Sequence, residues 1–438
     1  MTDSGFAKSG FERDAGEFAR GARAIVVLPD TGGSMRDTDA RLEETAGLAA
    51  AIGVEVVGRM AFRIRQAKPA TLLGSGQVEQ IKDRAEEQGA ELVVVDGALT
   101  PVQQRNLETA IGCKVIDRTG LILEIFGERA ATAEGRLQVE LAHLDYQAGR
   151  LVRSWTHLER QRGGFGFLGG PGETQIEADR RLIRDRMARL RRELEGVSRT
   201  RGLHRDRRQR APWPVVALVG YTNAGKSTLF NRLTGADVMA EDLLFATLDP
   251  TLRQFALPGI DRAMLSDTVG FVSELPTQLV AAFKATLEEV VSADLIVHVR
   301  DIAHPDSDAQ RADVETVLTD LGVGDEILTP RIEAWNKIDA LDPEARDAVL
   351  ADAAKRDDAV ALSAMTGEGV DDLITAISER LTRGHRRYHI DLDPGDGAGA
   401  AWLHAHGEVL DQWMADDRLM MEVRLAEQDY GRFIQRDA

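Results

Sequence analysis

A buried strand followed by a glycine-rich loop and a helix constrains the fold of this 438-residue chain more than any other feature. Val215–Val219 (VVALV) predicts the strand, and Gly220–Thr228 (GYTNAGKST) follows it directly in the pattern GxxxxGK[ST]. Apolar Leu229, Phe230 and Leu233 then predict a helix. In this context the glycines let backbone N–H groups point inward at phosphate oxygens, so we predict a phosphate-binding loop in an α/β domain with a mostly parallel sheet.

Polar side chains in and after this loop match the needs of phosphate chemistry. The Lys226 ammonium is expected to reach the β- and γ-phosphates, and the Ser227 hydroxyl is expected to ligate magnesium. A strand downstream ends in the DxxG pattern (DTVG), and this position gives weight to a pattern that is otherwise common by chance. We expect Asp267 to hold magnesium through a water molecule and the Gly270 N–H to contact the γ-phosphate.

The pattern NKxD, at the end of a further strand, discriminates between the purines. An aspartate carboxylate accepts hydrogen bonds from N1–H and the 2-amino group of guanine, whereas adenine offers neither donor and leaves such a site unpaired. The four residues Asn336, Lys337, Ile338 and Asp339 therefore predict selection of GTP over ATP. The segment Ala361–Met365 (ALSAM) is expected to finish the base pocket through backbone contacts of Ser363, Ala364 and Met365.

A threonine between the loop and DxxG is expected to close onto magnesium and the γ-phosphate as a switch. The segment Phe245–Thr251 (FATLDPT) offers two candidates, Thr247 and Thr251. The residues alone do not choose between them.

The first third of the chain alternates short apolar runs with stretches of helical periodicity, which predicts a parallel α/β domain. The runs are Ala24–Leu28, Val54–Val57, Leu92–Val95 and Lys114–Ile116, and the helical stretches are Ala40–Ile52, Gln77–Gln88 and Pro101–Ile111. Gly74-Ser75-Gly76 is expected at a strand-to-helix turn. Its glycines can approach a phosphate there, but a simple tight turn is the favoured interpretation.

Two long helices joined by a glycine-rich loop are expected next. The first is predicted at Leu137–Gln161 and the second at Glu173–Val197, where Ile183, Met187, Leu190, Leu194 and Val197 step by four and three. They should form an antiparallel hairpin. Phenylalanines at its exposed tip, flanked by charge, favour a contact role over a merely flexible loop.

Charge is distributed unevenly along the chain. The net charge of -18 argues against a protein that coats nucleic acid, yet arginines concentrate between Arg180 and Arg210. A basic segment on an acidic protein indicates one localised contact with a polyanion. A solvated helix face followed by a flexible linker explains the same charge equally well.

Composition and punctuation indicate a multidomain globular chain. No apolar stretch is long enough to span a bilayer, the N-terminus lacks the apolar core of a signal peptide, and Cys113 is the only cysteine. We expect a cytoplasmic monomer that is not an integral membrane protein, with partial membrane association left open. The expected parts are a flexible N-terminus (1–23), an α/β domain (24–134), a helical hairpin (135–198), a basic linker (199–212), a P-loop GTPase domain (213–383) and a small C-terminal α/β module (384–438).

Four stretches of the sequence resemble the HflX family of translation-factor-class GTPases. They are Gly135–Gln161, Gly169–Arg186 (with GPGETQ), Gly220–Asn231 (GYTNAGKSTLFN), and Phe245–Arg253 (FATLDPTLR) with Asp267–Phe271 (DTVGF). The resemblance covers nearly the whole chain in the family's domain order, and the C-terminal module is its least secure part. It implies a GTP hydrolase that binds the large ribosomal subunit, with the hairpin loop reaching ribosomal RNA, and that splits, rescues or recycles ribosomes. It also favours Thr247 as the switch threonine.

The motifs and the resemblance together assign three groups of residues. Lys226, Thr247 and Gly270 are expected to act in catalysis, and Mg²⁺ is expected on Ser227, Thr247 and, through water, Asp267. The residues expected to contact ribosomal RNA are Gly163, Gly164, Phe165, Gly166, Phe167, Arg180, Arg181 and Arg184. Those expected to contact GTP or GDP are Gly220, Tyr221, Thr222, Asn223, Ala224, Gly225, Lys226, Ser227, Thr228, Phe245, Ala246, Thr247, Leu248, Asp249, Asp267, Thr268, Val269, Gly270, Asn336, Lys337, Ile338, Asp339, Ser363, Ala364 and Met365.

Two residues depart from the best-known small GTPases. Phe271 follows DTVG, where a water-orienting glutamine often sits, and a phenyl ring cannot orient water by hydrogen bonding. We therefore expect slow hydrolysis alone and acceleration by a partner, the ribosome. Asn223 resembles the residue that coordinates K⁺ in some related GTPases, where K⁺ supplies the charge of an arginine finger; a loop-stabilising asparagine is the slightly favoured alternative.

Two other functions stay open from the residues alone. One is an RNA-remodelling nucleotidase whose N-terminal domain binds ATP, although that domain contains no second complete P-loop. The other is a non-catalytic, nucleotide-dependent adaptor to a membrane or protease complex, for which the missing glutamine is the best support. The NKxD pattern disfavours a kinase or an ordinary P-loop ATPase.

Overall fold

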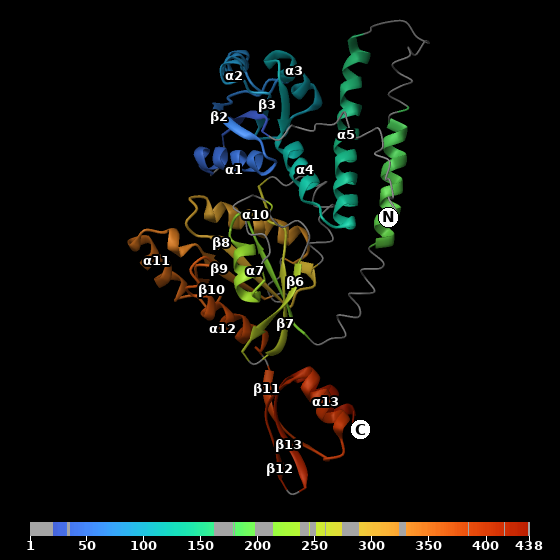
Figure 1. Cartoon of the computed structure of the whole chain (residues 1–438), viewed down its shortest axis with the longest axis vertical. Coiled ribbons are helices and arrows are strands. Elements are labelled where there is room, and N and C mark those ends of the chain that lie inside the picture. Colours follow the sequence, from blue (N-terminus) through green and yellow to red (C-terminus); the bar gives the residue numbers. More distant parts are fainter. Residues whose placement is uncertain are drawn as a thin grey trace, which may run out of the picture. The chain divides into compact units, whose positions relative to one another are not determined.

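The chain, shown as a computed structural model in Figure 1, forms two compact units. One contains residues 1–128 and 142–187, and the other contains residues 129–141 and 188–438. The residues that the structure describes are 21–32, 36–161, 178, 180–197, 213–236, 245, 251–258, 260–273, 289–323, 330–383, 385–415 and 417–436, with side chains of the first long helix described to residue 150.

The N-terminal domain is a four-stranded parallel sheet with strand order β2-β1-β3-β4. Its strands are β1 (Arg23–Asp30), β2 (Glu55–Arg63), β3 (Leu92–Val95) and β4 (Lys114–Asp117), and its helices are α1 (Thr38–Ala51), α2 (Ser75–Gln88), α3 (Pro101–Ile111) and α4 (Arg118–Arg129). The apolar runs form strands because burial of their branched side chains builds the core, which includes Ile25, Val27, Val93 and Val95. The predicted parallel α/β domain is confirmed.

The Gly74-Ser75-Gly76 segment differs from its predicted place. It does not lie at a strand-to-helix turn, because β2 ends at Arg63 and a loop separates that strand from α2. Gly74 is the N-cap residue of α2 with φ of -72°, and its N–H donates to Gln77 Oε1 at 2.8 Å. The first glycine therefore serves helix capping and needs no left-handed backbone.

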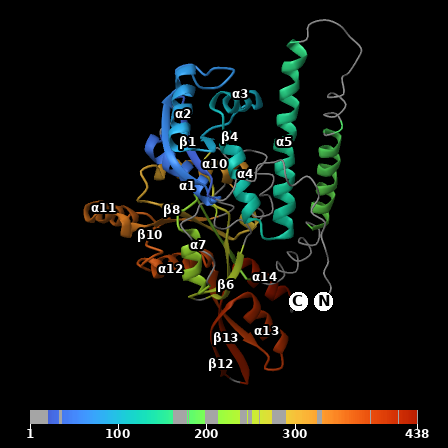
Figure 2. The same ribbon diagram turned by 45° about the horizontal axis from the view of Figure 1, so that its top comes forward.

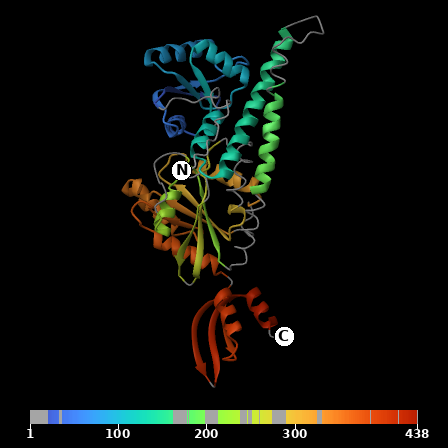
Figure 3. The ribbon, with the colours of Figure 1, turned by 45° about the vertical axis from the view of Figure 1, so that its right-hand side comes forward.

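Two long helices follow, as predicted. α5 spans Ala133–Gln161, and a second helix is described over residues 180–197. Met187 and Leu190 are buried on the second helix, while Ile183, Leu194 and Val197 are half-buried, so the predicted apolar seam is confirmed. The start of α5, to residue 141, belongs to the same compact unit as the end of the second helix, from residue 188. The rest of α5 belongs to the same unit as the start of the second helix, which is the pairing expected of antiparallel helices (Figures 2 and 3).

The P-loop domain is a six-stranded sheet with strand order β10-β9-β8-β5-β7-β6. All neighbouring strands are parallel except the pair β6–β7. The strands are β5 (Val215–Gly220), β6 (Thr251–Leu257), β7 (Ile260–Asp267), β8 (Leu295–Asp301), β9 (Arg331–Asn336) and β10 (Ala359–Ala361). The described helices between and after them are α7 (Lys226–Thr234), α10 (Ser307–Asp320), η1 (Ile338–Ala340), α11 (Pro343–Ala353) and α12 (Val370–Leu381).

The C-terminal module is a three-stranded antiparallel sheet with strand order β11-β13-β12. Its elements are β11 (His385–Leu392), α13 (Gly397–His406), β12 (Glu408–Ala415), β13 (Arg418–Ala426) and α14 (Glu427–Arg436). Leu403 and Phe433 from the two helices pack with Met421 and Val423 of the central strand. Within the described parts of the chain, no helix combines the length and the hydropathy that a membrane crossing requires.

Candidate functional site

The loop after β5 adopts a shape that only glycine permits at two positions. Gly220 has φ of 154°, and a Cβ atom there would lie 2.2 Å from the Val299 carbonyl oxygen. Gly225 is the N-cap residue of α7 with φ of 92°, and its Cβ would lie 2.2 Å from Asn336 Nδ2. The loop is thus pressed against β8 on one side and against the NKxD segment on the other, which leaves no room for a side chain.

The Lys226 ammonium is held over this loop. Its Nζ donates to the carbonyl oxygen of Tyr221 at 2.7 Å and to that of Gly220 at 3.1 Å. Burial lowers the pKa of Lys226 to about 8, and the nearby Asp267 carboxylate opposes this shift. A buried cation with a lowered pKa at the mouth of a helix N-terminus is a group that a polyphosphate would stabilise.

The two side chains expected at magnesium lie together. Asp267 is the last residue of β7 and is fully buried, and its Oδ2 accepts a hydrogen bond from Ser227 Oγ at 2.9 Å. A hydroxyl and a carboxylate beside a phosphate-binding loop are the hard oxygen ligands that Mg²⁺ prefers, so the donor set fits the ion. The neighbouring Thr268 hydroxyl is committed elsewhere, because it donates to the Leu218 carbonyl oxygen at 2.6 Å.

The residues at the end of the DxxG segment and just after it form hydrogen bonds with the phosphate loop. Phe271 N–H donates to Gly220 O at 3.1 Å, Thr222 N–H donates to Phe271 O at 2.7 Å, and Ser273 N–H donates to Tyr221 Oη at 2.8 Å. The Phe271 side chain is only 2% exposed. Phe271 therefore fixes the segment to the loop, and its ring is packed in the core.

Asn336 of the NKxD pattern joins the phosphate loop to the segment Ala361–Met365. Asn336 is buried, and its amide donates to Ala224 O at 2.7 Å while its Oδ1 accepts from Ala364 N–H at 2.8 Å. Lys337 adopts φ of 69° and pairs with Asp301 at 2.7 Å. Asp339 is exposed, and its carboxylate has no hydrogen bond to any residue that the structure describes. An exposed carboxylate without such a bond can accept hydrogen bonds from a ligand.

Arg232 was not predicted from the sequence, and it binds the segment that is expected to finish the base pocket. Arg232 lies on α7, and its Nε donates to Ala364 O at 2.7 Å while its Nη2 donates to Met365 O at 2.6 Å. Ser363 is buried, and its Oγ accepts from Thr366 N–H at 3.0 Å. No local pattern marks Arg232, because its partners are more than 130 positions away in the sequence.

The switch segment is described only in part. Phe245 is buried with φ of 58°, and Ala246, Thr247, Leu248 and Asp249 lie outside the described residues. Thr251 begins β6 and lies opposite Asp267 in the antiparallel pair β6–β7. The ladder between β6 and β7 fixes the backbone of Thr251.

The residues expected to contact RNA are also described in part. Arg181 and Arg184 are exposed on the second long helix, and Arg180 is half-buried. Gly163, Gly164, Phe165, Gly166 and Phe167 lie outside the described residues.

The N-terminal sheet presents ion pairs at the carboxyl ends of its strands. Arg118 Nη1 pairs with Asp96 at 2.6 Å, Arg118 Nη2 also pairs with Glu44, and Arg41 pairs with Asp96 at 3.1 Å. This is the edge where open α/β sheets bind ligands. In the described residues it is occupied by mutually satisfied charges, and the described conformation offers no phosphate-binding loop there.

Four family models match successive parts of the chain. They are described as GTP-binding GTPase N-terminal (residues 39–127), GTP-binding GTPase Middle Region (129–208), 50S ribosome-binding GTPase (215–337) and HflX C-terminal domain (348–436). A GTPase HflX from Magnetococcus marinus is 51% identical over 411 residues, which cover 94% of each chain. The chain belongs to the HflX family of GTPases.

A second relative and a solved structure extend this comparison. GTPase HflX of Escherichia coli K12 is 43% identical over 397 residues, 90% of this chain and 92% of the relative. A GTP-binding protein of Sulfolobus solfataricus, solved with GDP, matches 83% of this chain with a TM-score of 0.44 and 22% identity. As an HflX-family protein with a P-loop GTPase domain, the chain is a GTP hydrolase.

Proposed function

We propose that this HflX-family GTPase binds the large ribosomal subunit and acts in ribosome splitting, rescue or recycling. The observation that carries the proposal is the exposed basic face with Arg181 and Arg184 on a chain whose net charge is -18. A localised basic surface on an acidic protein fits one defined contact with an RNA backbone. The description of the model that matches residues 215–337, a 50S ribosome-binding GTPase, supports a ribosomal source for that RNA.

The nucleotide is proposed to bind across the loop after β5, with its base between NKxD and Ser363–Met365. Ser227 and Asp267 would hold Mg²⁺, with Thr247 as a third group from the switch segment. The ion would neutralise charge that develops on the β- and γ-phosphates. Lys226 would contact the same phosphates, and the Gly270 N–H would sense the γ-phosphate.

Slow hydrolysis by the free protein follows from the packing of Phe271. A buried phenyl ring, 2% exposed, neither reaches nor orients an attacking water. We propose that contact with the large subunit supplies the missing alignment, and that cleavage then releases the protein. The regulated step would be the hydrolysis itself.

A potassium ion is a second proposed contributor to the charge at the phosphates. Asn223 adopts φ of 59° and is exposed, and its side chain makes no hydrogen bond to the described part of the protein. This geometry gives the side chain no loop-stabilising bond there, which supports the cation-binding alternative. Equal hydrolysis rates in sodium and in potassium chloride would argue against a potassium site.

Sedimentation with purified large subunits tests the proposed partner. We expect the full chain to pellet with the subunit in the presence of a non-hydrolysable GTP analogue and to stay in the supernatant with GDP. Lys226→Ala is the nucleotide-binding control and should weaken the analogue-dependent fraction. A pellet of equal size with analogue, GDP and no nucleotide would contradict a switch.

A further inference from the structure

The Thr222 hydroxyl is a buried polar group inside the phosphate loop that the described structure leaves without a hydrogen bond. Thr222 is 6% exposed, and its Oγ1 has no hydrogen-bond partner among the described residues. Its backbone N–H is already engaged, since it donates to Phe271 O at 2.7 Å. A buried hydroxyl without a partner is costly and uncommon, so such a group marks a place that a ligand or a water molecule completes.

The Thr222 side chain lies beside Gly270 and the Lys226 ammonium, with its methyl carbon toward Gly270 and its hydroxyl on the same Cβ atom. A Cβ atom built on Gly270 would lie 2.8 Å from Thr222 Cγ2, 3.0 Å from Thr222 Cα and 3.1 Å from Lys226 Nζ. Thr222, Gly270 and the Lys226 ammonium thus converge on one point. In the proposed function, that ammonium and the Gly270 N–H face the γ-phosphate.

Among the residues that the structure describes, the position after DxxG offers no side chain to align the nucleophile. Phe271 occupies the position where a glutamine often performs this task, and its ring is buried. Its backbone instead pairs with residues 220 and 222, which fixes the phosphate loop and the DxxG segment to each other. The backbone of Thr222 is therefore held at a fixed place relative to Gly270.

We propose that the Thr222 hydroxyl is a positioning group for the attacking water, an inference that rests on the proposed GTP site. In the hydrolysis step, the water oxygen forms a bond to the γ-phosphorus, and the bond from that phosphorus to the β,γ-bridging oxygen breaks with its electron pair leaving on GDP. A proton of the water passes to a γ-phosphate oxygen. The Thr222 hydroxyl accepts a hydrogen bond from the water and is not consumed.

Two substitutions separate the hydroxyl from the methyl group of Thr222. Thr222→Val keeps the shape and the contact with Gly270 but removes the hydroxyl, whereas Thr222→Ser keeps the hydroxyl and removes the methyl. For the full chain with saturating GTP, we expect the single-turnover hydrolysis rate of Thr222→Val to fall by about tenfold to a hundredfold. Thr222→Ser should retain most of the wild-type rate. Thr319→Val, which removes an exposed hydroxyl on α10, is the matched control.

Nucleotide affinities show whether the hydroxyl acts on the water. We expect Thr222→Val to bind GDP and a non-hydrolysable GTP analogue with wild-type affinity. A selective loss of analogue affinity would assign the hydroxyl to the γ-phosphate itself and overturn the proposal. An unchanged hydrolysis rate in Thr222→Val, or an equal loss in Thr222→Ser, would also overturn it.

The rates are measured with and without large ribosomal subunits. If the subunit fails to stimulate the wild-type protein, the proposed ribosomal function fails. The ratio of wild-type to Thr222→Val rates in the free protein still tests the role of the hydroxyl, so the two failures are distinguishable.

Discussion

Two side chains fix the Ala364–Met365 segment, which is predicted to line the base pocket. Asn336 fixes Ala364 through its N–H, and Arg232 fixes the carbonyl groups of Ala364 and Met365 from the opposite side. Both sets of hydrogen bonds hold the same short segment, in which the Met365 side chain is exposed. The guanidinium fork matches two neighbouring carbonyl oxygens, whereas a lysine ammonium offers a single compact charge.

Replacement of Arg232 should weaken guanine binding. We expect Arg232→Ala to lower GDP affinity by about tenfold, because two hydrogen bonds from a charged donor are lost and the segment beside the base loosens. Arg232→Lys should recover only part of the loss. Isothermal titration with GDP measures the effect. The control is Arg380→Ala on α12, which removes a hydrogen bond from the Arg380 guanidinium to Asp357 O. An Arg232→Ala protein with the wild-type GDP affinity would show that the brace is dispensable.

Substitution of Gly270 tests the predicted contact between its N–H group and the γ-phosphate. Its Cβ position lies 3.0 Å from the Thr222 Cα, a backbone atom that cannot rotate away. Gly270→Ala should push the DxxG segment off the phosphate loop and reduce GTP hydrolysis by at least about tenfold, while GDP affinity changes little. Stopped-flow binding and single-turnover hydrolysis measure the two quantities. Equal losses in GDP binding and in hydrolysis would contradict this separation.

At the scale of elements, the sequence predicted strands and helices best where periodicity and burial agree. The P-loop strand, the helical seam and the apolar runs of the first domain all have that consistency. α4 was missed because Leu121, Ile122, Leu123, Ile125 and Phe126 form a short apolar run, and such a run does not distinguish a buried helix from a buried strand. The Gly74 cap was missed because a glycine at a helix start resembles a glycine at a turn.

The candidate site shows the same limit. The sequence predicted the loop, the magnesium pair and the NKxD residues because their spacing is local and their chemistry is specific. It did not predict that Thr268 bonds to Leu218, that Phe271 pairs with the phosphate loop, or that Arg232 reaches Ala364. Those contacts join segments that meet only after the sheet has formed.

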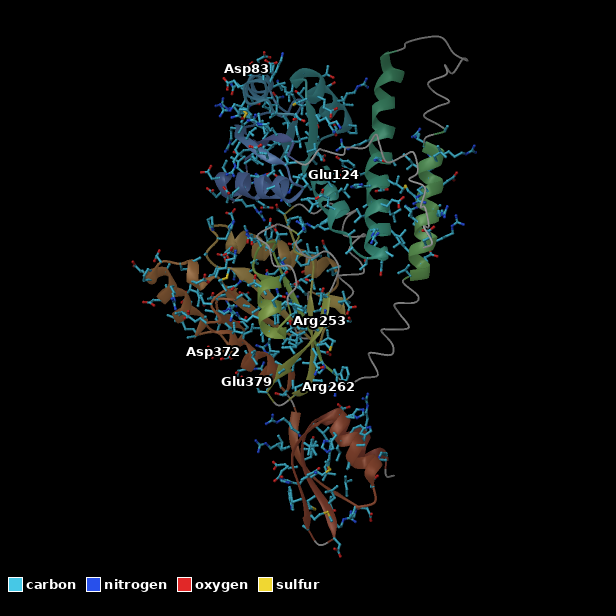
Figure 4. The ribbon with its side chains drawn as sticks, viewed as in Figure 1. Asp83, Glu124, Arg253, Arg262, Asp372 and Glu379 are labelled. Carbon is cyan, nitrogen blue, oxygen red and sulfur yellow. The ribbon has the colours of Figure 1, made fainter. Side chains whose placement is uncertain are left out.

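α4 also carries a carboxyl group whose burial makes stability depend on pH. Figure 4 labels this residue, Glu124. Burial, helped by the negative charge of Glu128, raises the pKa of Glu124 from 4.5 to about 7. The folded state therefore binds more protons than the unfolded state between these values, and stability falls as pH rises through that window. Glu124→Gln should add about 1 kcal/mol to the free energy of unfolding at pH 8, after allowance for solvent screening of a half-buried group, and nothing at pH 4.

Urea denaturation of the full chain at pH 4 and pH 8 measures this effect. Glu79→Gln on the exposed face of α2 is the matched control and should change little at either pH. A Glu124→Gln protein that gains the same stability at both pH values would rule out ionisation as the cause.

At the scale of the whole molecule, an acidic chain carries exposed arginines on its second long helix. The charge of -18 disfavours general binding to RNA, so binding to the large subunit should depend on the arginines of the second long helix. Arg181→Gln combined with Arg184→Gln should weaken binding and reduce the slope of log affinity against log salt by roughly 1.5, since each lost phosphate contact removes about 0.7 to 0.9.

The comparison of affinities is made across a series of potassium chloride concentrations. Arg346→Gln, which removes a partly exposed arginine from α11, is the control and should leave both affinity and slope near wild type. Salt slopes that are equal for the wild type and the double variant would show that these arginines do not meet phosphates.

GTP turnover with and without purified large ribosomal subunits tests the central claim most directly. The full chain, at saturating GTP and in the same magnesium and potassium buffer, should hydrolyse GTP slowly alone and much faster when subunits are added. Lys226→Ala gives the background rate of the subunit preparation. Turnover that barely changes when subunits are added would contradict the account of a switch that awaits the ribosome.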